Sequence, residues 1–197
     1  HSVAYQQAQY FVAAHADEIY VDPLGFVLIE GYDRYRMYYK AALDKLGVDM
    51  NVYRVGAFKS AVEPYVRQDM SPEDREESVA YLGALWSNYQ AVVTKARGLA
   101  PTAIADYVGS IGSTVSAAKG DAPKVALDAK LITGIKSSID IEARVAELVG
   151  EDEASGSFNE ISLTDYLRVE RAEEKLHADA KARIGVIVAS GEILDGD

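Results

Sequence analysis

The sequence predicts an α/β fold, and three observations lead to this class. Short apolar segments that read as strands alternate with segments of helical periodicity, in the order strand, strand, helix, strand, helix. Hydrophobic residues make up 49% of the 197 residues, which is enough to bury a core. The apolar runs are short, as in residues 26–29, and fall far below the roughly 18 residues needed to cross a bilayer.

The first elements precede residue 30. Residues 8–16 predict a short helix. Residues 18–22 predict a strand that Pro23 ends, and residues 26–29 predict a second strand that is apolar throughout.

A helix and a third strand are expected next. Asp33 is a suitable N-cap for a helix that runs to residue 46 and is stopped by Gly47. Its tyrosines, among them Tyr35 and Tyr39, and the neighbouring basic residues could stack on nucleic-acid bases. Their helical spacing and the acidic balance of the chain favour core packing instead. Residues 48–55 then alternate in polarity and predict a strand.

The clearest helix start is at Ser71-Pro72-Glu73-Asp74. Serine is a preferred N-cap, proline is favoured at the first helical position, and acids in the first turn complement the helix dipole. The helix is expected to end at Gly98. Apolar side chains recur along it at helical spacing: Val79, Leu82, Leu85, Trp86, Tyr89 and Val93.

The rest of the chain is predicted to be mainly helical. A helix from residue 101 to residue 108 is expected to be broken by Gly109 and Gly112, and a second helix is capped by Asp121 and ends at residue 130. A third helix is expected over residues 139–149, followed by an acidic loop or disordered patch over residues 150–156. A charged helix then runs from Ser162 to about residue 182. Asp165, three residues after Ser162, completes a capping box for the last helix.

The charge distribution argues against a nucleic-acid partner. The formal net charge is −11, and residues 151–197 carry twelve acidic against five basic residues. A chain this acidic repels phosphate backbones. Cysteine is absent, which excludes disulfides and thiolate metal sites but does not decide the compartment.

Lys59 is the candidate for chemistry. It follows the predicted strand and Gly56, and it precedes a turn that Pro64 sets. Among Val, Ala and Phe, a fold can desolvate an amine, which lowers the lysine pKa and makes the amine a base. We therefore expect Lys59 at the end of an extended segment, with its amine facing an apolar concave surface. Taken alone this signal is weak, because most lysines after a strand are solvated surface residues.

The neighbours of Lys59 have simpler interpretations. Ser60 is adjacent on an extended backbone, so its side chain would point to the opposite face, and a hydrogen-bonding turn hydroxyl is favoured over a nucleophile. Glu63 could hold the lysine ammonium or stabilise the turn, and the structural role is favoured. The three histidines share no ligand spacing, so no metal site and no cofactor are predicted.

The segment Gly56-Ala57-Phe58-Lys59-Ser60-Ala61-Val62-Glu63-Pro64-Tyr65, followed by Asp69-Met70-Ser71-Pro72, closely resembles the lysine motif of a known family. This family is the bacterial signal peptide peptidases of the long two-repeat type, called SppA or protease IV. Residues 5–10 and 18–25 resemble the helix and strand upstream of the lysine in this family, and residues 184–196 resemble the strand that opens its second repeat, so the resemblance covers most of the chain.

The resemblance implies a ClpP/crotonase-like repeat, incomplete at both ends, followed by a helical linker. Residues 1–135 would be the distal part of the first, lysine-bearing repeat. Residues 136–182 would form the helical linker region, and residues 183–197 the first strand of a truncated second repeat.

The implied function is that of a membrane-associated serine endopeptidase that degrades cleaved signal peptides. Lys59 would be the general base of a Ser/Lys dyad, and the nucleophilic serine is expected outside this chain, so the fragment alone should be inactive. A membrane anchor is expected upstream, at the periplasmic face of the bacterial inner membrane, and the complete protein is expected to be a homo-oligomer. The alternative is a non-catalytic assembly module, or an acyl-CoA-type enzyme, of the same superfamily.

Overall fold

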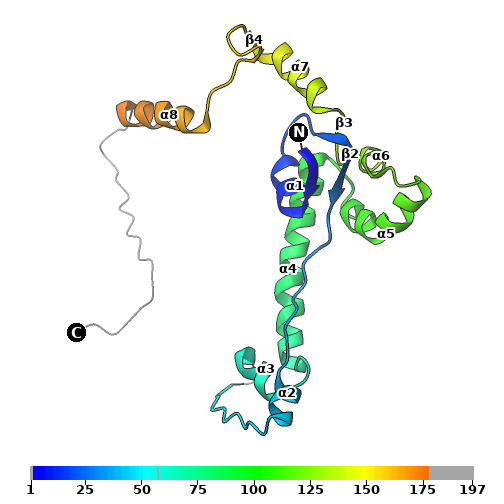
Figure 1. Ribbon diagram of the computed structural model, residues 1–197, viewed down its shortest axis with the longest axis vertical. Helices are drawn as coiled ribbons and strands as arrows, with labels where there is room; N and C mark the ends of the chain where they lie inside the picture. Colours follow the sequence, from blue (N-terminus) through cyan, green and yellow to red (C-terminus); the bar gives the residue numbers. More distant parts are fainter. Residues whose placement is uncertain (1, 57, 178–197) are drawn as a thin grey trace. The chain divides into compact units, whose positions relative to one another are not determined.

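The computed structural model describes residues 2–56 and 58–177, and the chain divides into two compact units, residues 1–144 and 145–197. Each unit is described by itself. The first contains, in order, β1 (Ser2–Gln6), α1 (Gln7–Ala13), β2 (Tyr20–Leu28), α2 (Lys40–Lys45), the 3-10 turn η1 (Ser60–Val62), α3 (Glu63–Val66), α4 (Pro72–Arg97), α5 (Ala103–Ala117), α6 (Ala122–Asp128) and β3 (Gly134–Ile135) (Figure 1). Helix α7 (Ser138–Val149) crosses the boundary between the units.

The three strands form a parallel sheet in the order β1-β2-β3, so the predicted α/β class is confirmed. The two strands predicted on either side of Pro23 are one strand. The register with β1 shifts between Ser2, opposite Val21, and Ala4, opposite Phe26. This bulge contains Pro23, which explains why a proline does not end β2: its missing N–H falls where the ladder is already interrupted.

The core lies around the sheet. Its largest fully buried apolar side chains come from α1, β2, α4, α5 and the segments that flank β2 and follow α6: Tyr10, Ile19, Ile29, Ile104, Leu131, Val21 and Val93. Three tyrosine hydroxyls donate hydrogen bonds to main-chain carbonyls at the edge of this core. Tyr10 binds Leu131 at 2.6 Å, Tyr107 binds Val27 at 2.7 Å and Tyr89 binds Gln7 at 3.1 Å. Burial raises the pKa of all three hydroxyls, to about 12 for Tyr107.

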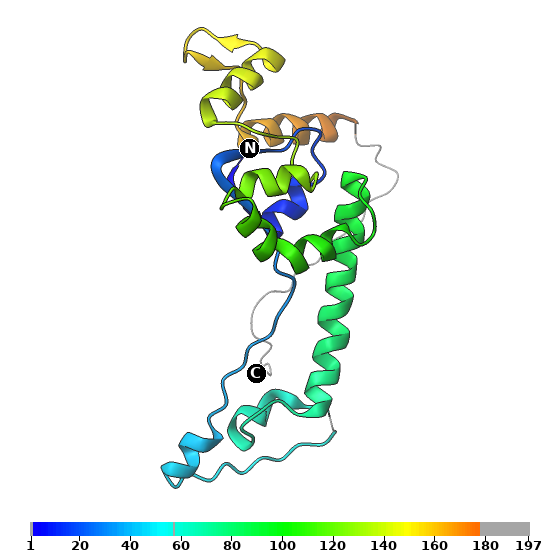
Figure 2. The same cartoon turned by 90° about the vertical axis from the view of Figure 1, so that its right-hand side faces the viewer.

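The predicted long helix is confirmed as α4, which is unbroken in both views (Figure 2). The Ser71 hydroxyl accepts the Asp74 N–H at 3.1 Å, and Gly98 ends the helix in the left-handed conformation at φ 61°. Only the last turns pack into the core, through Tyr89, Val93 and Thr94, whereas the first turns bury the polar residues Asp74 and Ser78.

The predicted helix over residues 33–46 is wrong in its first half. Residues 33–39 have no regular secondary structure, and only α2 is helical. The tyrosines expected in the core are not buried there: Tyr35 is 90% exposed, and Tyr39 stacks on Tyr65 with ring centroids 5.9 Å apart. The strand predicted over residues 48–55 is absent as well, and its side chains are largely exposed.

Helix α5 continues through Gly109 and Gly112 to Ala117, so the predicted break is wrong. A glycine costs a helix only about 1 kcal/mol relative to alanine, and the buried Ile104 and Tyr107 anchor this one in the core. The helix capped by Asp121 is confirmed as α6, where the Asp121 carboxylate accepts the Lys124 N–H at 3.0 Å.

The predicted helix over residues 139–149 is confirmed as α7. In the second unit, the stretch predicted as a loop or disordered patch belongs to a small antiparallel hairpin, β4 (Glu151–Asp152) with β5 (Ser157–Phe158). The prediction is wrong for residues 151–152, which form β4, and residues 153–156 are the turn. Helix α8 (Leu163–His177) follows, and the Asp165 N–H donates to the Ser162 hydroxyl as the capping box predicts. The expected strand after residue 183 lies outside the described residues.

Candidate active site

Lys59 lies in a tight turn between the irregular segment that precedes it and α4. Gly56 has φ +105°, a backbone conformation that residues with a side chain rarely adopt. Lys59 is the residue immediately before η1. Pro64 then fixes the first turn of α3. The turn predicted from the sequence is therefore present, but the strand predicted before it, over residues 48–55, is absent.

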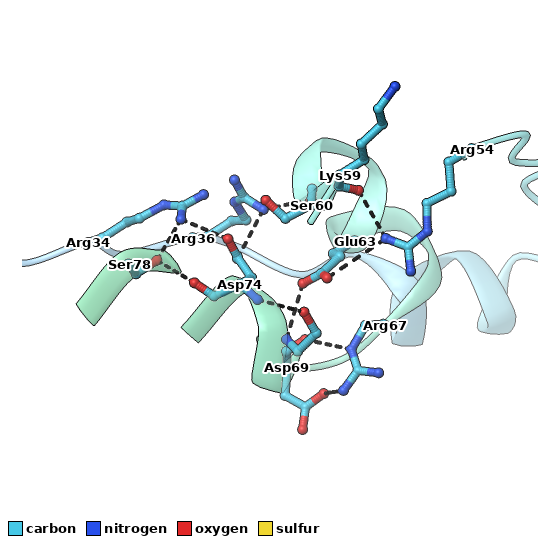
Figure 3. Close-up of polar contacts among 11 residues, drawn as sticks. Arg34, Arg36, Arg54, Lys59, Ser60, Glu63, Arg67, Asp69, Asp74 and Ser78 are labelled. Atoms are coloured by element: carbon cyan, nitrogen blue, oxygen red, sulfur yellow. Dashed lines mark hydrogen bonds and ion pairs between the residues drawn. The ribbon is translucent and has the colours of Figure 1, made fainter. Parts of the chain in front are cut away.

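A concave surface of about 600 Å³ lies at Lys59. Its lining combines the turn with one face of α4 and is of mixed polarity: Arg34, Phe58, Lys59, Ser60, Ala61, Glu77, Ser78 and Tyr81. The expected concavity is therefore present. The expected desolvation is not supplied by the described residues, because the Lys59 side chain is exposed and extends away from the polar network beneath it (Figure 3).

The centre of that network is the completely buried carboxylate of Asp74, in the first turn of α4. Arg34 Nη1 lies 2.8 Å from one of its oxygens and Arg36 Nη1 lies 3.5 Å from the other. Burial alone would raise the pKa of the Asp74 carboxyl, but hydrogen bonds from Ser60 and Arg34 and the charges of both arginines outweigh it. The pKa of Asp74 is therefore lowered.

Glu63 is the second completely buried carboxylate of this region. Its Oε2 accepts the Ser71 N–H at 3.1 Å, and its Oε1 lies 3.9 Å from Arg54 Nη1. The predicted structural role of Glu63 is confirmed, because the carboxylate joins α3 to the start of α4.

Ser60 is buried, and its groups are engaged beneath the turn. Its main-chain carbonyl accepts a hydrogen bond from Arg36 at 2.8 Å, and its hydroxyl hydrogen-bonds Asp74. This is the hydrogen-bonding role that sequence reasoning favoured over a nucleophile.

Sequence reasoning missed Arg34, Arg36, Arg54 and Asp74 as parts of this region. Asp74 was noticed only as an ordinary acid in a helical first turn. The available signal was the spacing of Arg34 and Arg36, because two residues separated by one point to the same side of an extended chain and can face one carboxylate.

A second, more apolar concavity of about 560 Å³ adjoins the first and shares Arg34 and Ser78 with it. Its apolar lining comes mainly from α4 and its surroundings: Tyr32, Met70, Val79, Leu82, Trp86 and Val108. The Tyr32 ring meets Trp86 edge to face, with centroids 6.4 Å apart.

Within residues 2–56 and 58–177, no group of three or more His, Cys, Asp or Glu side chains is arranged to hold a metal ion. The helices of the same residues also include none whose length and apolar character would let it span a membrane.

Comparison with known proteins places the chain in a family. Residues 2–150 match the family model described as Peptidase family S49. The chain belongs to peptidase family S49. The resemblance drawn from the lysine motif is thereby confirmed, and the small parallel sheet with its helices is consistent with the ClpP/crotonase-like fold that the resemblance implied.

The similar curated proteins agree with this assignment. The S49 chain is 38% identical over 193 residues to Protease 4 of Salmonella typhi and 34% identical over 193 residues to Protease 4 of Haemophilus influenzae. Each match covers 98% of this chain but only 30% and 31% of the respective relative. The chloroplastic serine protease SPPA of Arabidopsis thaliana is 21% identical over 136 residues, 68% of this chain and 20% of that protein. The S49 chain therefore spans about a third of the length of the first two relatives.

Proposed function

We propose that this S49 chain is part of a serine endopeptidase in which Lys59 is the general base of a Ser/Lys dyad. The nucleophilic serine would be supplied from outside the 197 residues. The observation that carries the proposal is the setting of Lys59: its turn lies on a concave surface, and the nearby Glu63 is engaged by Ser71 and Arg54 rather than by the lysine amine.

The chemistry assigns one role to Lys59. Its neutral amine takes the proton of the serine hydroxyl as the serine oxygen attacks the peptide carbonyl, and it then gives that proton to the leaving amine. A water molecule releases the acyl group in the second half of the reaction. A carboxylate bound to the amine would favour the ammonium form and oppose this role, so the engagement of Glu63 elsewhere supports it.

The proposed substrate is a peptide, and the apolar concavity beside the Lys59 surface supports this choice. Apolar side chains of an extended peptide would fit against Leu82 and Trp86 while the peptide bond reaches Lys59. Cleaved signal peptides are proposed as the natural substrate because of the resemblance of the lysine motif. The same resemblance supports an upstream membrane anchor, a site of action at the periplasmic face of the bacterial inner membrane, and a homo-oligomeric complete protein. Membership of a peptidase family favours this function over the acyl-CoA-type alternative.

The test uses the complete protein and the variants Lys59→Ala and Lys59→Arg, with Lys45→Ala as a control on an exposed lysine of α2. Loss of a general base should lower kcat/KM by roughly 10²–10⁴-fold in both Lys59 variants, because a guanidinium stays protonated and cannot accept the serine proton. The control should follow the wild type. An arginine variant that keeps more than a few per cent of the activity would remove Lys59 from this role.

The isolated 197-residue chain supplies a second test. It should hydrolyse casein or a signal peptide no faster than its own Lys59→Ala variant, because the proposed nucleophile lies elsewhere. Hydrolysis by the purified chain that depends on Lys59 would place the serine within these residues.

A further inference from the structure

Two consecutive main-chain carbonyls at the candidate base are held by arginines. The carbonyl of Lys59 accepts a hydrogen bond from Arg54 Nη1 at 2.9 Å, and the carbonyl of Ser60 accepts one from Arg36 Nη1 at 2.8 Å (Figure 3). The two arginines approach from different segments, one just before the turn and one from the extended segment ahead of α2.

Each arginine is in turn held by a carboxylate that is completely buried. Arg54 lies 3.9 Å from Glu63, and Arg36 lies 3.5 Å from Asp74. Both carboxylates are anchored by the start of α4: the N–H of Ser71 donates to Glu63, and Asp74 belongs to the helix itself. The turn is thus connected through two arginine–carboxylate pairs to the end of one long helix.

Regular secondary structure does not fix Lys59. Its backbone angles, φ −90° and ψ 79°, lie outside helix and strand, and residues 51–55 before it have no regular structure. The side chain is exposed and has four rotatable bonds, so the location of the amine depends on how well its main chain is held. A displacement of about 1 Å at a reacting group can cost roughly 100-fold in rate.

We propose that Arg54 and Arg36 are positioning residues that hold the main chain of Lys59 in place for general-base catalysis. The inference rests on the proposed role of Lys59. It predicts that replacing either arginine lowers kcat by more than the accompanying loss of stability would explain.

The first arm of the test changes Arg54 in the complete protein. Arg54→Met keeps the apolar stem and removes the donor, and it should lower kcat about tenfold or more while KM stays within about twofold. Arg54→Lys keeps a donor and should recover most of the lost kcat. Arg67→Met is the matched control, because Arg67 is 39% exposed against 38% for Arg54 and pairs with Asp69. The control should show wild-type kcat and KM.

The second arm compares Arg36→Met with Arg34→Met. Both remove an ion pair to Asp74, and the pair lost with Arg34 is the shorter, at 2.8 Å against 3.5 Å. Only Arg36 also holds the Ser60 carbonyl. A purely structural role predicts the larger fall in melting temperature and in kcat for Arg34→Met. The positioning role predicts the larger fall in kcat for Arg36→Met.

Lys59→Ala is measured in parallel to separate the two hypotheses. If Lys59→Ala retains activity, the proposed function fails. If Lys59→Ala is inactive while Arg54→Met and Arg36→Met turn over within twofold of the wild type, only the positioning inference is overturned. An Arg54→Lys variant no better than Arg54→Met, or kcat losses that follow the melting temperatures, would overturn it as well.

Discussion

Arg34 and Asp74, forty residues apart in the sequence, form an ion pair of 2.8 Å in which the carboxylate is completely buried. The pair fastens an extended, irregular segment to the first turn of the longest helix. Ser78, one turn further along α4, receives a second hydrogen bond from the same Arg34 nitrogen at 2.7 Å. The segment is therefore held by polar contacts where a core of apolar side chains is lacking.

Replacing Asp74 by Asn should destabilise the chain. The substitution leaves two arginines without their counter-charge, and breaking a buried pair in this way costs about 3 kcal/mol. Urea unfolding followed by circular dichroism measures the change. Asp69→Asn is the control, because Asp69 is 77% exposed in its pair with Arg67 and should cost less than about 1 kcal/mol. Equal losses in the two variants would contradict the prediction.

The stabilisation by Asp74 should depend on pH. The pKa of this carboxyl is lowered in the folded chain, so the unfolded chain binds the proton more tightly. The contribution is complete above the ordinary value of 3.8 and is lost as the pH falls through the lower folded value. The difference in unfolding free energy between the wild type and Asp74→Asn should therefore shrink on acidification. A difference that grows as the pH falls would show that the pKa is raised instead.

Two glycines should respond to alanine in opposite directions. A Cβ atom on Gly25 would lie 1.8 Å from the Val3 carbonyl oxygen in the neighbouring strand, so Gly25→Ala must push β1 and β2 apart. We expect a loss of about 2 kcal/mol or more. At Gly109 in α5 a Cβ meets nothing within 4 Å, and Gly109→Ala should stabilise the chain by about 1 kcal/mol. Thermal unfolding of both variants tests the pair, and a neutral Gly25→Ala would contradict the close approach of the strands.

Glu18 should titrate well below an ordinary glutamate. Hydrogen bonds from Arg144 and then Tyr20 lower the pKa of its carboxyl from 4.5 to about 2. Arg144 lies 2.6 Å from one carboxylate oxygen and 3.1 Å from the other. Carboxyl carbon NMR should show the low pKa in the wild type and a return towards 4.5 in Arg144→Met, with a smaller rise in Tyr20→Phe. An unchanged titration in Arg144→Met would remove the arginine as the main cause.

The sequence predicted best where local signals decide the structure. Ser71, Pro72 and Gly98 mark both ends of α4 through caps that depend on a few neighbouring residues. The family of the lysine motif was recognisable for a similar reason, because the motif is contiguous. The catalytic role of Lys59 remains a prediction.

The predictions were wrong where the structure of a segment depends on contacts with residues far away in the sequence. Residues 33–39 have helical periodicity, but Arg34 and Arg36 both contact Asp74, and that contact is invisible to a local pattern. Residues 48–55 alternate like a strand, yet an alternating segment becomes a strand only when another strand is available to pair with it. The two arginine–carboxylate pairs beneath Lys59 also escaped notice. Arg36 and Asp74 are far apart in the sequence, and Arg54 meets Glu63 only because the irregular segment before Lys59 turns back.

The pairing of Tyr20 with Gly134 has a consequence for the order of events during synthesis. Closing a loop of more than one hundred residues costs roughly 4 kcal/mol of chain entropy, so β3 should join the sheet late. At a translation rate of about 5–20 residues per second, the outer edge of β2 would stay unpaired on the ribosome for roughly 5–20 seconds. A nascent chain stalled before Gly134 should therefore be cut within β2 by a brief protease pulse, while one released well past Ile135 should resist. We expect the chain to need a chaperone most in this interval, while the edge of β2 is unpaired.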